Sequence, residues 1–129
     1  MTIGVYFIDS SVTRGDLFFQ ATRHAADTNE QHNARIDLIK SGAYKLVGQH
    51  NNLDYTSDLE DAWGATQNLE NPWIMADTVI QADENGNEQE VKTPVRSAMV
   101  GDIFVQNGEL YFVTGLGFER LPGSLLQYL

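Results

Sequence analysis

The segment DIFVQNGELYFV, residues 102–113, constrains the fold more than any other part of this chain. Its centre is Asn107-Gly108, a dipeptide that tolerates the positive φ angles of a two-residue type I′ turn. Such a turn fixes the pairing of the flanking runs, and the facing pairs are then Val105 with Leu110, Ile103 with Phe112, and Phe104 with Tyr111. Both faces of this predicted hairpin are apolar, so we expect the rest of the chain to cover it on both sides.

Three further segments have features of β-structure. Residues 2–8 (TIGVYFI) are rich in β-branched and aromatic side chains, which favour a strand. Residues 43–50 (AYKLVGQH) alternate only loosely, but clear breaks flank them, and we expect a strand there too. Residues 77–93 contain Asn85-Gly86 between two polar arms, which predicts an exposed hairpin with a two-residue turn.

Three short helices are also expected. Residues 13–26 carry apolar side chains at helical spacing, with Thr13 as the candidate N-cap. Residues 29–42 form a second helix that ends at a glycine in the C-cap position. Ser57 and Glu60 form the clearest capping box of the chain, so we expect a third helix that begins there. Its expected buried face is Leu59, Ala62 and Trp63, and Asn68 and Pro72 mark its exit.

The length and composition indicate one folded unit. The chain has 129 residues, no cysteine and no evident linker or internal repeat, so we treat residues 1–129 as a single domain. The predicted fold class is α+β: a small antiparallel sheet or partly closed barrel, containing the C-terminal hairpins and packed with two to three short helices. Alternation alone does not distinguish an open sheet from a closed barrel.

The net charge of −10 is concentrated in the middle of the chain, where residues 43–91 contain one basic and ten acidic side chains. A surface of this kind repels phosphate backbones, so we expect no direct nucleic-acid partner. It serves either as a solubilising face or as a patch that docks on a basic partner. No apolar run is long enough to span a membrane, and we expect a cytoplasmic protein with no membrane partner.

No catalytic motif is evident. His24, His32 and His50 do not have the spacing of a metal-binding motif, and residues 83–88 (DENGNE) differ from an EF-hand loop in the position of their glycine. We therefore predict no catalytic residue, no metal and no cofactor. An enzyme remains the alternative only if its site is assembled by the fold from residues whose spacing does not reveal it.

The chain resembles a family of small uncharacterised proteins borne by phages, plasmids and other mobile elements. The resemblance lies in two segments, YKLVGQHNNLDYTSDLEDAWGATQNLENPW (44–73) and VRSAMVGDIFVQNGELYFVTGLGFERL (95–121). The resemblance covers roughly residues 32–121. The residues that carry it are Asp58, Leu59, Glu60, Thr66, Asn68, Trp73, Arg96, Ser97, Val100, Gly101, Asp102, Gly117 and Phe118. Ala98-Met99 stand where such proteins commonly have Ser or Thr, so no hydroxyl-based role is expected there.

The resemblance implies no known activity, but it implies a mobile genetic element as the setting. By analogy with small acidic phage proteins, we expect an accessory protein that binds a host macromolecule, in particular a basic or nucleic-acid-binding protein, as a modulator or inhibitor. The partner-binding residues predicted for this role are Tyr55, Asp58, Glu60, Asp61 and Trp73.

Two alternatives belong to other functional classes. The first is a small ligand-binding domain or enzyme, and its predicted pocket residues are Trp63, Asn68, Trp73, Arg96 and Asp102. The second is a virion or assembly component, which would form a stable homo-oligomer.

Overall fold

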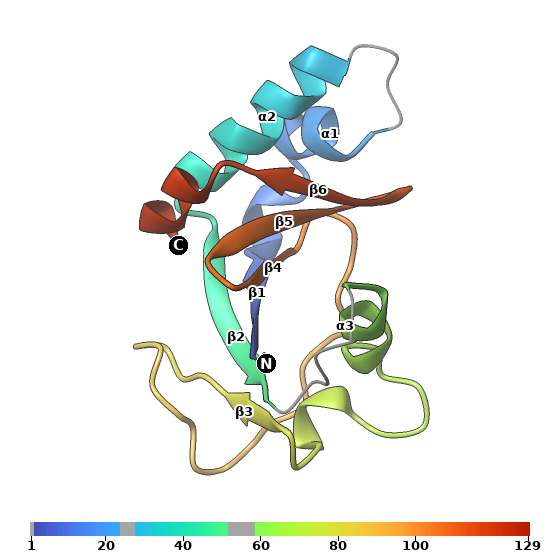
Figure 1. The fold of residues 1–129 in the computed structure, drawn as a ribbon, viewed down its shortest axis with the longest axis vertical. Coiled ribbons are helices and arrows are strands. Elements are labelled where there is room, and N and C mark those ends of the chain that lie inside the picture. Colours follow the sequence, from blue (N-terminus) through green and yellow to red (C-terminus); the bar gives the residue numbers. More distant parts are fainter. Residues whose placement is uncertain (1, 24–27, 52–58) are drawn as a thin grey trace.

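A computed structural model describes residues 2–23, 28–51 and 59–129, and it has the predicted α+β class. Six antiparallel strands form one sheet in the order β3-β2-β1-β4-β5-β6 (Figure 1). The strands are β1 (Ile3–Ile8), β2 (Tyr44–His50), β3 (Val79–Gln81), β4 (Ile103–Gln106), β5 (Glu109–Thr114) and β6 (Gly117–Leu121). Because β3 and β6 are its two edges, the sheet is open and does not close into a barrel.

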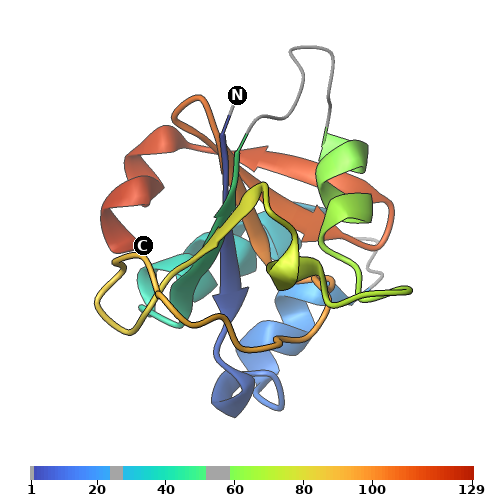
Figure 2. The same cartoon turned by 90° about the horizontal axis from the view of Figure 1, so that it is seen from below.

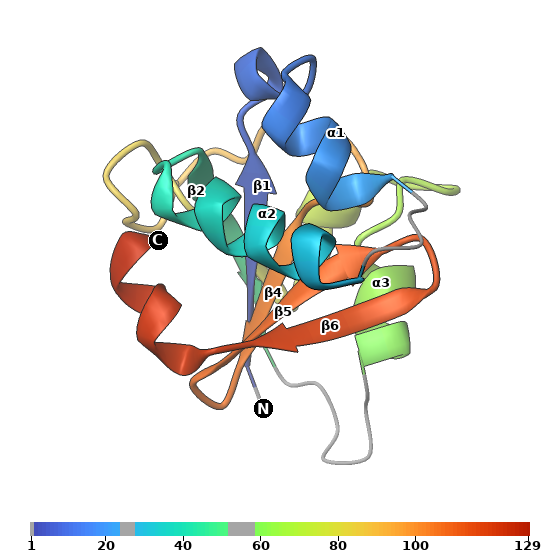
Figure 3. The same ribbon diagram turned by 90° about the horizontal axis from the view of Figure 1, so that it is seen from above.

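Helices cover the sheet at both ends of the molecule. They are α1 (Asp16–Thr22), α2 (Thr28–Lys40) and α3 (Leu59–Ala65), with three 3₁₀ turns, η1 (Ser10–Val12), η2 (Trp73–Met75) and η3 (Gly123–Tyr128). The helices α1 and α2 pack on each other at one end, and α3 lies toward the other end with η2 and β3 (Figures 1 and 3).

Two hydrophobic cores lie on the two faces of the sheet. One core combines α1, α2 and η3 with the side chains of β4 and β5 that point to their side, including Ile103, Leu110 and Phe112. The other combines α3 and η2 with Phe104, Val113 and alternate residues of β1. Because successive side chains of a strand point to opposite faces, neighbours such as Phe112 and Val113 enter different cores.

The predicted hairpin of residues 102–113 is confirmed. Strands β4 and β5 pair in the expected register, with Val105 opposite Leu110 and Ile103 opposite Phe112. The two turn residues Asn107 and Gly108 have φ angles of 53° and 74°, as a type I′ turn requires.

The second hairpin, predicted in residues 77–93, forms only in part: the amide of Asp83 donates to the carbonyl of Asn87 and that of Gln89 to the carbonyl of Gln81, both at 2.7 Å, and Ala82 bridges Glu88, but the second arm is not a strand. Only Val79–Gln81 forms a strand, which pairs with β2, and the amide of Gly86 donates to the carbonyl of Asp83 at 3.1 Å. The φ of Gly86 is positive, at 80°, but the φ of Asn85 is not, so these two residues do not form the predicted type I′ turn. The segment after the turn is polar and has no apolar side to bury, so its pairing ends after Gln89, and the side chain of Gln81 binds the backbone of Thr93 further along.

The helix ends agree with the predictions in part. Helix α2 ends as expected before Gly42, whose φ is 76°. Helix α1 has Gly15 as its N-cap, and Thr13 instead closes η1 by donating its hydroxyl to the carbonyl of Ser10, so that N-cap prediction is wrong. Helix α3 is present, but Ser57 of its predicted capping box lies outside the described residues.

Candidate functional site

Hydrogen bonds of Asn68 and Trp73 connect the loop after α3 (residues 66–73) to the segment before β4. The Asn68 side-chain amide donates to the carbonyl of Val95 at 2.6 Å, and its oxygen accepts the Trp73 backbone amide at 2.9 Å. The Asn68 backbone amide donates to the Ser97 hydroxyl at 2.8 Å, and the Trp73 indole donates to the carbonyl of Arg96 at 2.9 Å. Residues 66–73 therefore have a fixed path, although they form no strand.

Arg96 and Asp102 form a bidentate ion pair at the base of this loop, with N–O distances of 2.6 and 2.8 Å. The Asp102 carboxylate is fully buried and also accepts the backbone amides of Ile8, at 3.0 Å, and Met99, at 2.7 Å. The Arg96 guanidinium lies 4.0 Å from the centre of the Phe7 ring, a cation–π contact. These polar groups thus hold β1 and β4 to the preceding segment.

The five residues predicted for a ligand pocket do not surround a single cavity. Asn68, Trp73, Arg96 and Asp102 belong to the connected network just described, while Trp63 lines a separate cavity of about 330 Å³ between α3 and the β5–β6 turn. Trp73 is only 4% exposed and packs on Phe7 with a ring-centre distance of 6.0 Å. In the described part of the chain the network is therefore a structural one, with its polar atoms bound to each other.

A wider groove of about 780 Å³ lies along the loop and η2, and we call it the η2 groove. Its lining residues are Ala65, Gln67, Leu69, Glu70, Asn71, Pro72, Trp73, Met75, Ala76 and Asp77. Leu69 is 83% exposed and Met75 is 40% exposed, whereas Trp73 forms part of the floor. Sequence reasoning missed this groove, and the available signal was a pair of large apolar residues in a loop rich in Asn, Pro and acidic side chains.

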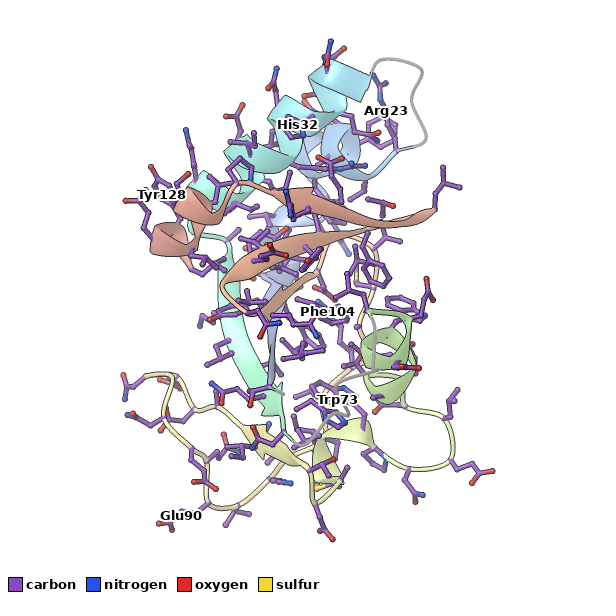
Figure 4. The ribbon with its side chains drawn as sticks, in the orientation of Figure 1. Arg23, His32, Trp73, Glu90, Phe104 and Tyr128 are labelled. Carbon is purple, nitrogen blue, oxygen red and sulfur yellow. The ribbon has the colours of Figure 1, made fainter. Side chains whose placement is uncertain are left out.

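The predicted acidic residues Glu60 and Asp61 are exposed on α3, while Tyr55 and Asp58 lie outside the described residues. Further exposed carboxylates follow in the loop after α3, between η2 and β3, and in the segment after β3. Together they form what we call the acidic end: Glu60, Asp61, Glu70, Asp77, Glu84, Glu88 and Glu90. Figure 2 looks onto this end of the molecule, and Figure 4 places Glu90 there, far from Arg23 and His32.

The opposite end, formed by α1, α2 and β6, contains a cavity of about 480 Å³ whose lining includes three arginines, Arg23, Arg35 and Arg120. The Glu119 carboxylate lies among them and accepts hydrogen bonds from Arg35 and His32. Charge is thus distributed unevenly between the two ends, although the protein as a whole is acidic.

The described histidines do not form a metal site. His32 contacts Glu119, and His50 lies at the end of β2, where burial lowers its pKa below the ordinary value and a hydrogen bond to the carbonyl of Asn51 opposes that shift. No group of three or more His, Asp or Glu side chains among residues 2–23, 28–51 and 59–129 could hold a metal ion.

Among the described helices, none combines the length and the apolar character needed to cross a membrane. No protein-family model, curated protein or solved structure matches this chain.

Proposed function

We propose that this protein is an accessory protein of a phage or similar mobile element, and that it binds a basic host protein through its acidic end. The observation that carries the proposal is the concentration of seven exposed carboxylates on α3, in the loop after it, between η2 and β3, and in the segment after β3. The setting in a mobile element, and in the host cytoplasm, is supported by the sequence resemblance of residues 44–73 and 95–121.

Charge complementarity gives the acidic end a physical role in binding. Like-charged carboxylates in one region create a field that attracts a basic surface, speeds the encounter and rejects acidic partners. The same field disfavours nucleic acid, so the expected partner is a protein whose basic surface would otherwise contact phosphate.

The state of the buried polar groups supports a binding role over a catalytic one. Arg96 and Asp102, the charged residues predicted for the alternative ligand pocket, bind each other and nearby backbone groups. A catalytic carboxylate needs access to a substrate proton or carbon, and Asp102 is fully buried.

The test is affinity capture from bacterial lysate at low and high salt, with two charge-reversed proteins. The double variant Glu60→Lys with Glu90→Lys alters the acidic end, and Asp16→Lys with Asp37→Lys changes the net charge equally on α1 and α2. We expect one stoichiometric partner that is lost at high salt and lost by the first variant but kept by the second.

Retention of the partner by the Glu60/Glu90 variant would contradict the proposal, as would the absence of any specific partner. In the latter case the cavity beside Trp63 becomes the site to test with small ligands.

A further inference from the structure

We propose that the η2 groove binds a short basic peptide segment of the partner, with a large apolar side chain of that segment placed between Leu69 and Met75. This inference rests on the proposed function and adds to it a defined contact site and the chemistry of the partner segment. The argument combines the exposure of apolar residues, the fixed shape of the groove and its charge.

Two large apolar residues of the groove, Leu69 and Met75, are exposed to solvent instead of packed in the interior. Single exposed apolar side chains are common on protein surfaces, but Leu69 and Met75 line the same depression, and Pro72 and Trp73 belong to its lining too. Thioether and aliphatic groups adapt to differently shaped partners, as recognition of a peptide requires. The groove therefore offers an apolar anchor site for a side chain of a partner segment.

The groove is preformed. Its floor, Trp73, is held by hydrogen bonds at its backbone amide and its indole, and η2 is closed by bonds from Met75 to Pro72, at 3.1 Å, and from Ala76 to Trp73, at 3.3 Å. A partner segment thus meets a surface that needs little ordering, which reduces the entropic cost of binding.

The charge of the groove selects a basic segment. Glu70 and Asp77 belong to its lining and are exposed, and Glu60 lies on the preceding helix. Lys92 reaches the rim, where its ammonium group donates to the carbonyl of Ala76 at 2.9 Å. Carboxylates outnumber this cation at the groove, so lysine or arginine beside the apolar anchor gains attraction, and an acidic segment is repelled.

The experiment selects peptides from a random linear display library on the intact protein, and then measures affinities of the enriched peptides as synthetic probes. We expect sequences that combine Lys or Arg with a large apolar residue. Leu69→Ser and Met75→Ser should each weaken binding by about tenfold or more, as expected for loss of a buried apolar contact. Leu116→Ser is the matched control, since Leu116 is 88% exposed and lies outside the groove.

Four results of this experiment would contradict the inference. It fails if no peptide is enriched, if the enriched peptides lack basic or apolar residues, or if Leu69→Ser and Met75→Ser bind them as well as the unaltered protein. Equal loss in Leu116→Ser would also overturn it, because binding would then not depend on the groove. Leu69 is largely exposed, so its replacement is expected to leave folding intact, and urea unfolding of each variant checks this.

The same measurements separate this inference from the proposed function. Basic peptides that respond to Glu60→Lys with Glu90→Lys but not to Leu69→Ser would refute the groove and leave the acidic end as the binding surface. Peptides that bind the groove with no salt dependence would instead refute the electrostatic role proposed above.

Discussion

Replacing Asp102 with alanine should destabilise the protein more than any single surface change. The fully buried carboxylate accepts four hydrogen bonds, two from Arg96 and one each from the backbone amides of Ile8 and Met99. In Asp102→Ala both amides lose their acceptor, and an unsatisfied buried donor costs about 1–3 kcal/mol. Together with the loss of the ion pair, the expected decrease in unfolding free energy is about 3–5 kcal/mol.

That decrease is a large part of the roughly 5–15 kcal/mol that stabilises a typical domain. The measurement is equilibrium urea unfolding at neutral pH, followed by tryptophan fluorescence. With an m-value of about 1.5 kcal/mol per molar urea, a loss of 3 kcal/mol lowers the midpoint by about 2 M.

Arg120→Ala provides the matched control, because Arg120 forms an ion pair with Glu109 in which the two side chains are 67% and 45% exposed. An exposed pair contributes about 1 kcal/mol or less. The reasoning is refuted if Asp102→Ala lowers the free energy of unfolding by no more than Arg120→Ala does, since burial would then not increase the contribution of an ion pair to stability.

Two further predictions concern stability. Gly101 has a φ of 100°, and a Cβ there would lie 2.7 Å from a ring carbon of Phe18, so Gly101→Ala should lower the free energy of unfolding in urea by about 1–3 kcal/mol. The control is Gly64→Ala, which adds a methyl group into open space on α3 and should not lower it. Equal effects of the two variants would contradict the prediction. Burial lowers the pKa of His50 in the folded state, so the unfolded chain takes up the proton first as the pH falls. The contribution of His50 is therefore present above its ordinary pKa of about 6.5 and is lost progressively below it, and His50→Gln should show a smaller loss of stability between about pH 7 and pH 5 than the unaltered protein.

The hairpin of residues 102–113 was predictable because its determinants are local. Asn107-Gly108 selects the turn, the turn fixes the register, and the register decides which side chains share a face. Helix α2 was predictable for the same reason, because the helical spacing of its apolar residues and the glycine after its end are both local features of the sequence. The extent of the second arm of residues 77–93 was not predictable: it pairs with the first arm only around Glu88 and Gln89, because turn chemistry at Asn85-Gly86 does not determine how far the following residues continue in a sheet.

The candidate site was predictable only in its charge. The carboxylates of residues 59–91 are visible in the sequence, and polar side chains at this density have to remain in water, so Glu60 and Asp61 are exposed as expected. The exposure of Leu69 and Met75 follows from the path of the loop, which is set by the bonds of Asn68 to Val95 and to the Trp73 backbone.

The sequence by itself determined the α+β class, the central hairpin and the acidic middle segment, because turns, periodicity and charge depend on neighbouring residues. Only the tertiary structure decided that the sheet is open, that Trp73 packs against Phe7, and that Asp102 bonds to the amide of Ile8, 94 positions away. Contacts across such separations depend on how the two cores fill the faces of one sheet, and no local pattern contains that information.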